Sequence, residues 1–569
     1  MLSTYTWPRY TSPRAPELDA TSTRRVPLVI VGAGPVGLAA AVDAALHGLP
    51  VVLLDEDDTV SLGSRAVCHA KRTLEIFDRL GIGGRIVDKG VTWNVGRTFH
   101  REREVFSFDL LPERGHQRPG MVNLQQYHVE QILVERAQAL PGIDLRWRHK
   151  VVRATRNADD DADGVRLEVS SDEGSYTLHA DWLVAADGAR SGIRRQLGLK
   201  MQGKVFRDRF LIADIVLSGE PHADGMQGRA ERRFWFAPAF HAGESALMHR
   251  QPDNVWRIDF QLGWEADPEL EKEPERVRAR VRAALDSQRL EGLDFELEWV
   301  SVYTFQCRRM ARLRHGRVLF AGDSAHQVSP FGARGGNSGI QDADNLVWKL
   351  QQVIDGHAPE ALLDSYDAER GAAADDNLCQ SSRSTDFMAP KTRIARLLRE
   401  AVLSLADEVP AGRALVNSGR LSVPTVLRDS PLNTADADGT DFVGWMVPGA
   451  PLDDAPVRNA QGQLGWLLPH TGGEFVLLRF GTPSARPEPA VPGVRSLWIV
   501  PAAAAAAGGS DRNAWLADCE GLAAQRFDAR EGTCYLVRPD QHVAARWRAF
   551  DRAAVQAALA RALARERAA

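Results

Sequence analysis

A glycine-rich turn near the start of the chain restricts the possible folds more than any other feature. It reads Gly32-Ala-Gly34-Pro-Val-Gly37 and lies between an apolar stretch at 26–31 and an alanine-rich stretch at 38–47. The first glycine allows a tight turn, and the third lets a helix pack closely on the preceding strand. The pattern therefore predicts a buried strand, a turn and a helix.

Asp55 ends the next apolar stretch, residues 50–54. It follows the turn by about twenty residues, where a carboxylate can accept hydrogen bonds from a ribose. Gly34 would let the backbone approach a pyrophosphate at the N-terminus of the helix. Residues 26–55 thus predict a βαβ unit that binds a dinucleotide. A glycine-rich turn without a ligand is the alternative.

Two later apolar stretches also end in an acidic residue. The first leads into Asp187, with Arg190 three residues later, and the second leads into Asp323. An aspartate there can accept hydrogen bonds from ribityl hydroxyls. A glycine-rich run at 330–339 then predicts a helix that opens at about Gly339, and its backbone N–H groups can support negative charge on a flavin ring. These motifs favour FAD over NAD.

The three motifs, in this order, resemble those of the single-component (class A) flavoprotein aromatic hydroxylases, the family of phenol hydroxylase and 3-(3-hydroxyphenyl)propionate hydroxylase. The resemblance covers about residues 26–400. It implies FAD as cofactor, NADH or NADPH as reductant and O2 as co-substrate. It further implies that a phenolic or hydroxylated aromatic compound is hydroxylated through a flavin C4a-hydroperoxide, with the cofactor supplying the difficult chemistry.

The resemblance also implies roles for individual residues. Those matched to FAD binding are Gly32, Gly34, Gly37, Asp55, Arg65, Gln126, Asp187, Arg190, Asp323, Pro330, Gly335, Gly336 and Asn337. The candidates for catalysis are Pro330, His249 and Tyr303, the last two on aromatic-rich runs expected to line the substrate pocket. Val67 stands where phenol hydroxylase has its catalytic aspartate, so no single base is assigned.

The expected fold is α/β, with a Rossmann-like FAD-binding domain of the p-hydroxybenzoate hydroxylase type. Alternating aromatic-rich runs at 232–236, 246–250 and 255–262 predict an inserted antiparallel sheet. The end of the chain resembles a thioredoxin-like domain but lacks CxxC, so we expect packing or dimerisation there and no redox role. The predicted units are an N-terminal arm (1–26), the FAD-binding domain in two parts (27–200 and 306–430), the substrate sheet (201–305) and the C-terminal domain (445–569).

Composition excludes several other classes of protein. Seventy Lys and Arg against seventy-five Asp and Glu give a net charge of −5, which provides no general attraction to nucleic acid or an anionic membrane. The five cysteines include no CxxC pair, which argues against a disulfide framework and a metal site. No apolar run reaches the roughly 18 residues of a membrane span. We expect a cytoplasmic protein whose partner is a small aromatic substrate, with a homodimer left open.

The sequence leaves three alternatives to a phenolic hydroxylase. A polyketide-tailoring hydroxylase of the same fold would differ in the size of its substrate pocket. A flavin halogenase is disfavoured, because the Trp-x-Trp-x-Ile-Pro signature is missing. A non-catalytic flavin-binding scaffold is disfavoured because every predicted FAD loop keeps its small or acidic residue.

Overall fold

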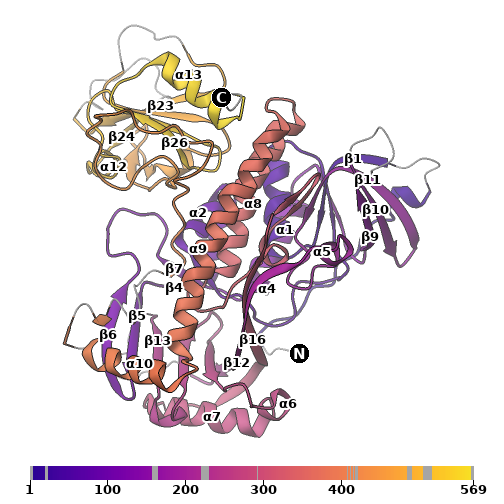
Figure 1. Cartoon of the computed structure of the whole chain (residues 1–569), viewed down its shortest axis with the longest axis vertical. Coiled ribbons are helices and arrows are strands. Elements are labelled where there is room, and N and C mark those ends of the chain that lie inside the picture. Colours follow the sequence, from indigo (N-terminus) through magenta and orange to yellow (C-terminus); the bar gives the residue numbers. More distant parts are fainter. Residues whose placement is uncertain are drawn as a thin grey trace.

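The computed structural model describes residues 4–19, 24–156, 164–219, 230–290, 292–406, 408–409, 412–413, 416, 421–483, 490–503 and 515–565. Figure 1 shows an α/β architecture in which a C-terminal unit lies beside two larger sheets. Within these residues, no helix combines the length and apolar character needed to cross a membrane.

The first large sheet has a parallel core whose strands are buried and apolar. Its order is β18-β11-β1-β2-β8. The strands are β1 (Arg24–Val31), β2 (Val51–Leu54), β8 (Ile143–Arg146), β11 (Gly174–Ala185) and β18 (Val318–Phe320). The short β17 (Arg314–His315) pairs with β18, and β9 (Lys150–Arg156) and β10 (Val165–Ser171) extend β11. Such a core needs helices on its faces, and α1 (Pro35–Leu46) packs against α4 (Gln126–Gln138) and α8 (Gly335–Ile354).

The second large sheet is mostly antiparallel, as predicted. Its order is β19-β16-β12-β15-β14-β13-β5-β6. The strands are β5 (Val95–His100), β6 (Arg103–Asp109), β12 (Met201–Leu217), β13 (Arg232–Phe236), β14 (Ser245–Arg250), β15 (Val255–Gln261), β16 (Phe295–Met310) and β19 (His326–Gln327). Apolar residues of one face pack against α7 (Pro274–Ser287), next to the short α6 (Pro268–Glu271).

The hairpin β5–β6 belongs to this second sheet, although it comes from the stretch expected in the first part of the FAD-binding domain. It joins through parallel pairing of β5 with β13. A small sheet, β3-β7-β4, is formed by strands that lie between β2 and β8 in sequence: β3 (Cys68–Ala70), β4 (Val91–Trp93) and β7 (Met121–Asn123). The remaining helices of this part are α2 (Lys71–Arg79), α3 (Gly83–Lys89), α5 (Gly192–Gln196), α9 (Asp364–Met388) and α10 (Arg393–Ala406).

The C-terminal unit has its own sheet in the order β21-β20-β24-β23-β22-β25-β26. Its elements are β20 (Pro456–Arg458), β21 (Leu464–Trp466), β22 (Val476–Phe480), β23 (Arg495–Pro501), β24 (Trp515–Asp518), α12 (Leu522–Arg526), β25 (Cys534–Val537), β26 (Val543–Trp547) and α13 (Arg552–Ala562). Strands β22, β23 and β24 run parallel, and β25 runs antiparallel to β22. The thioredoxin-like assignment stays a prediction.

Two stretches with little regular secondary structure pack against the protein. In the N-terminal arm, the ring of Tyr10 stacks on Trp147 at a centroid distance of 4.8 Å. The Asp-, Pro- and Gly-rich stretch at 430–460 contributes Met446 and Leu452 to the core of the C-terminal unit. Both stretches are therefore part of the packed structure.

Candidate active site

The ends of four parallel strands form the candidate site. Gly32 follows β1, Asp55 follows β2, Asp187 comes just after β11, and Asp323 just after β18. Parallel strands have their carboxyl ends at the same edge of the sheet, where ligands of open α/β sheets bind. The structure therefore brings together four residues that the sequence motifs singled out separately.

The three glycines of the turn have different surroundings. A Cβ on Gly32 would overlap the carbonyl oxygen of Ala186 in the loop after β11, and a Cβ on Gly37 would overlap the carbonyl oxygen of Gly32. A Cβ on Gly34 would meet nothing within 4 Å. Gly32 and Gly37 thus permit close packing, while Gly34 faces open space at the first turn of α1. That space fits a pyrophosphate at a helix N-terminus.

Asp55 lies against this turn. Its carboxylate accepts hydrogen bonds from the backbone N–H groups of Ala33 and, at 2.8 Å, Asp57. Burial raises its pKa to about 6, although both hydrogen bonds favour the charged form. The side chain is therefore mostly ionised at neutral pH and can act as a hydrogen-bond acceptor.

The loop that carries Arg65 is held from two sides. Gln126 on α4 accepts a hydrogen bond from Ala66 N (3.1 Å) and donates to Glu130 Oε1 (2.7 Å). From the second sheet, Arg257 donates to the carbonyl oxygens of Ser64 and Arg65. Gln126 is thus no free surface residue, because it fixes a predicted FAD loop. Arg65 itself is exposed.

Two further predicted residues, Asp187 and Arg190, lie in the loop after β11. Asp187 Oδ2 accepts a hydrogen bond from Ile193 N (3.0 Å), while its buried Oδ1 has no partner within the described part of the chain. Arg194 joins the ends of β11 and β18 by donating to the carbonyl oxygens of Ser324 and Ala189. Arg190 is exposed.

Asp323 is exposed to solvent, yet surrounding protein raises its pKa by desolvation. A carboxylate with both properties lines a recess rather than a convex surface. The positive charge of Arg65 lowers the pKa of Asp323, so the two side chains lie near each other. This arrangement suits a carboxylate that accepts hydrogen bonds from a polyol chain.

Asp342, inside α8, supports the turn before Asp323 and was missed by the sequence motifs. Its fully buried carboxylate accepts from Gly322 N (2.9 Å) and Arg370 Nε (2.7 Å), and Oδ2 lies 2.6 Å from His326 Nε2. Burial would raise its pKa, but His326 and Arg370 hold the pKa below the ordinary value. A carboxylate in the middle of a helix carries no local signal of such contacts.

Helix α8 begins at Gly335, four residues before the predicted start. The side chain of Asn337 fixes this first turn: it accepts from Ala70 N (2.9 Å) and donates to the carbonyl oxygens of Cys68 (2.9 Å) and Ala333. The early glycines, Gly335 and Gly336, thus enter the helix because tertiary contacts outweigh their low helix propensity.

Pro330 precedes this helix and is exposed. Its carbonyl oxygen accepts a hydrogen bond from Ala333 N at 2.9 Å. The Pro330 carbonyl is therefore part of a turn, with one lone pair used by the backbone.

His249 lies on the face of the second sheet that is turned away from α7. Its cross-strand neighbours are Arg232 on β13 and Arg257 on β15. Nδ1 of His249 lies 3.2 Å from Asn123 Nδ2 and 3.8 Å from Cys68 Sγ. Burial and the two arginines hold the pKa of His249 well below its usual value, so the ring is neutral.

Asp259 lies on the same face of the sheet as His249, but its surroundings raise its pKa, whereas they lower that of His249. Burial raises its pKa to about 6, against the pull of Arg257 and Arg232. The buried atoms Asp259 Oδ1 and Arg232 Nε have no hydrogen-bond partner among the residues that the structure describes. An unpaired acceptor and an unpaired donor on one face of a sheet can bind a polar group of a ligand.

Tyr303 is 49% exposed, and both Asp323 and Arg65 influence its pKa, which is raised chiefly by burial. It therefore faces the same recess as Asp323. Next to it lies an aromatic cluster formed by Phe106, Phe206, Phe210, Phe236, Phe305 and Phe331. These phenylalanine rings are buried, and Tyr303 is the exposed aromatic ring that packs against them.

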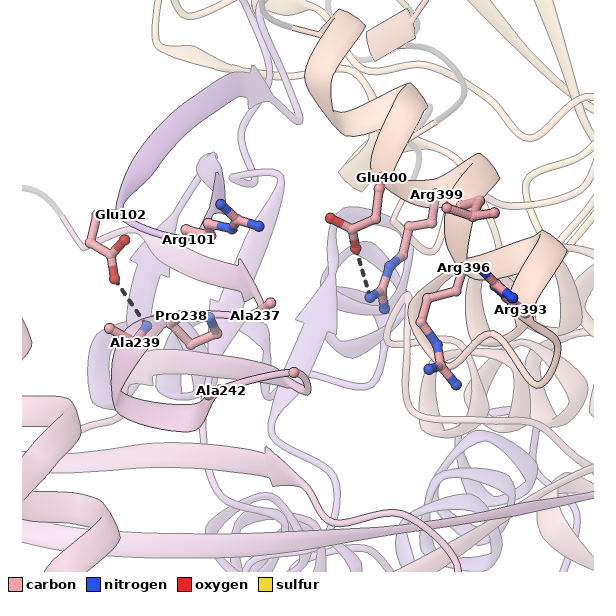
Figure 2. A pocket seen from close by; sticks show the side chains of 12 residues that line it. Arg101, Glu102, Ala237, Pro238, Ala239, Ala242, Arg393, Arg396, Arg399 and Glu400 are labelled. Atoms are coloured by element: carbon pink, nitrogen blue, oxygen red, sulfur yellow. Dashed lines mark hydrogen bonds and ion pairs between the residues drawn. The ribbon is translucent and has the colours of Figure 1, made fainter.

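A surface groove of about 640 Å³ lies elsewhere, between the β5–β6 turn, the β13–β14 connection and α10. Figure 2 shows Arg101 and Glu102 on one side of it and Arg393, Arg396 and Arg399 on the other. It contains no residue of the predicted FAD or catalytic set, so it is a separate surface feature.

Comparison with known proteins gives the following similarities. Residues 25–381 match the family model described as "FAD binding domain". The chain is 31% identical over 549 residues to 6-methylpretetramide 4-monooxygenase of Streptomyces rimosus, covering 91% of this chain and 90% of that protein. It is 28% identical over 442 residues to 3-(3-hydroxy-phenyl)propionate/3-hydroxycinnamic acid hydroxylase of Mycolicibacterium gilvum (strain PYR-GCK), covering 77% and 74%.

Among solved structures, the flavin-dependent monooxygenase PieE, crystallised with FAD and substrate, superposes with a TM-score of 0.76 at 24% identity. The match covers 95% of this chain and 99% of that one. At this identity the similarity shows the fold, and it extends through the C-terminal unit.

Proposed function

Since this chain belongs to the FAD-binding-domain family of flavoprotein aromatic monooxygenases, we propose that it uses NADH or NADPH and O2 to hydroxylate a phenolic ring. FAD, when bound, supplies the hydride acceptance and the O2 activation, with a C4a-hydroperoxide as the expected oxygen donor. The observation that carries this proposal is the meeting of Gly32, Asp55, Asp187 and Asp323 at one sheet edge, next to the recess that Tyr303 lines.

We propose a phenol fused to further rings as the substrate class. The relative that spans 91% of this chain is named for 6-methylpretetramide, and the half-exposed ring of Tyr303, packed on Phe305, offers an aromatic contact to such a ring system. A single-ring hydroxyphenylpropionate is the second candidate, because the next relative is named for it. His249, Tyr303 and Pro330 remain the proposed contacts to the reacting ring.

The direct test is oxidation of NADH and of NADPH by the FAD-loaded enzyme against a panel of phenols. The panel should contain polycyclic phenols, hydroxyphenylpropionates and nitrophenols, with the product mass recorded. We expect a polycyclic phenol to stimulate oxidation and to gain one oxygen atom. Stimulation by single-ring phenols alone would overturn the polycyclic proposal, and a lack of stimulation by every compound would argue against hydroxylation.

Asp259 is the residue we propose as the base that accepts the phenol proton. Its pKa of about 6 would keep it ionised at neutral pH, and a positioned base contributes roughly 10²–10⁴-fold to the rate. We expect kcat/KM to fall below about pH 6 as Asp259 gains a proton, and D259N to lower kcat at least about 100-fold. The measurement is a pH–rate profile with the stimulating phenol.

The matched control is D253N, on the β14–β15 turn of the same hairpin. Asp253 is exposed and pairs with Lys89 (2.7 Å), and its pKa is lowered to about 2. D253N should therefore keep the wild-type profile. If D259N retained the inflection near pH 6, the proposed role of Asp259 would be wrong.

A further inference from the structure

The C-terminal unit is joined to α2, α8 and α9 through buried charges. In Figure 1 its sheet and α13 lie beside the upper parts of α2 and α8. The seam network consists of side chains that are at most 4% exposed: Arg72, Asp344, Asn345, Lys349, Glu369, Arg538 and Asp540. Arg538 and Asp540 come from the turn between β25 and β26, and the other five come from the three helices.

Glu369 on α9 is the centre of this network. Arg538 donates to both its oxygens, at 2.5 and 3.0 Å. Lys349 Nζ and Asn345 Nδ2 on α8 each donate to Glu369 Oε2 at 2.7 Å. One carboxylate thus connects the C-terminal unit with α8 and α9.

The same turn also reaches α2. Arg72 donates to the carbonyl oxygen of Asp540 (2.7 Å) and to Asp344 Oδ2 on α8 (3.3 Å). Arg538 additionally donates to both carboxylate oxygens of Asp540, at 3.0 and 2.6 Å. Two arginines therefore bridge α2, α8 and the C-terminal turn.

The charge states agree with a tightly paired network. Burial would raise the pKa of Glu369, but Arg538 and Lys349 hold it far below its ordinary value. Burial lowers the pKa of Lys349 to about 8, against the attraction of Glu369. Apolar residues often replace buried ion pairs without loss of stability, so these pairs are weak evidence for a role in stability.

The helices that meet here also hold the predicted flavin loops. Helix α2 starts at Lys71, directly after β3, and Asn337 in the first turn of α8 binds the backbone of Cys68 and Ala70 in β3. Asn345 lies eight residues further along α8, about 12 Å from Asn337 at 1.5 Å per residue. A rotation of α2 relative to α8 at the seam would therefore displace β3 from the start of α8.

We propose that the C-terminal unit is a positioning element for the flavin site, with Arg538 as its key residue. Arg538 and Asp540 fix α2 against α8, and this alignment holds β3 and the Gly335–Asn337 turn in the geometry that accepts FAD. Arg538 acts through the helices and touches neither cofactor nor ring substrate. The proposal is independent of which compound is hydroxylated.

The test compares full-length variants in FAD titrations and in the visible spectrum of bound flavin. R538K keeps the charge, but its single ammonium group cannot replace the planar set of N–H donors with which the guanidinium binds Glu369 and Asp540 together. R538M removes the charge, and E369L/R538M replaces one ion pair by apolar side chains. We expect at least about tenfold weaker FAD binding and a shifted flavin spectrum in R538M and E369L/R538M, with a smaller effect in R538K.

The control is R530M in the same unit, because Arg530 forms an exposed pair with Asp441 at 2.8 Å. It should bind FAD like the wild type. R538K separates positioning from stability: it keeps a positive charge between Glu369 and Asp540, so it should melt closer to the wild-type temperature than R538M and still bind FAD more weakly than the wild type. Wild-type affinity and spectrum in E369L/R538M would overturn the proposal. If both methionine variants fail to fold, the proposal is tested by R538K alone. An FAD affinity of R538K equal to that of the wild type would then overturn the proposal.

Discussion

Replacing Gly34 by alanine should leave the protein folded but lower its FAD affinity at least about 100-fold, or about 2.7 kcal/mol. The residue has φ −74°, which alanine adopts without strain, and its Cβ would meet no atom within 4 Å. The added methyl group would instead occupy the space in which a pyrophosphate approaches the backbone. Isothermal titration of the FAD-free protein with FAD measures the loss.

Gly37→Ala is the matched comparison for Gly34→Ala. Its Cβ would overlap the carbonyl oxygen of Gly32, a backbone atom that cannot turn aside. Overpacking of this kind costs about 1–3 kcal/mol or more, so G37A should melt at a lower temperature even without FAD. Equal FAD affinity in G34A and the wild type would show that the pyrophosphate does not lie at this turn.

Asp342→Ala should destabilise the protein by about 3–5 kcal/mol, because removing one partner of a buried ion pair leaves the other uncompensated. Arg370 and the backbone N–H of Gly322 would lose their acceptor, and His326 its neighbour. Urea unfolding of the FAD-free protein measures this change. D355A at the exposed C-terminal end of the same helix should change stability by less than about 0.5 kcal/mol.

The contribution of Asp342 also depends on pH. Its pKa in the folded protein lies below the unfolded value of about 3.9, so the unfolded chain takes up the proton first as the pH falls. The stabilisation is complete above the unfolded pKa and is lost as the pH falls through the folded one. D342N should therefore lose less stability than the wild type between about pH 5 and pH 3. An equal loss in both proteins would contradict this assignment.

Residues that follow a strand were the easiest to predict. Gly32, Asp55, Asp187 and Asp323 each end or follow an apolar run, and that local pattern was sufficient to single out each of them, while the structure brought them to one sheet edge. Gln126 was matched to the flavin region by resemblance, but its contacts with Ala66 and Glu130 became visible only in the structure.

Residues whose partners lie far away in sequence were not predicted. Asp342 acts on Gly322, twenty residues earlier, and Arg257 on the loop at Ser64 and Arg65, 192 or more residues earlier. The polar row Arg232, His249 and Arg257 depends on the register of three strands. A one-residue slip of any strand would turn its side chain to the opposite face, and sequence pattern alone leaves that register open.

The sequence by itself determined the α/β class, the glycine turn and the order of the FAD motifs, because each depends on the backbone over a few neighbouring residues. Only the tertiary structure decided that β5 and β6 join the second large sheet, that α8 starts at Gly335, and that Arg538 joins the C-terminal unit to α8 and α9. These outcomes follow from packing, strand register and buried charge pairing between distant segments, whose energies no local pattern of residues specifies.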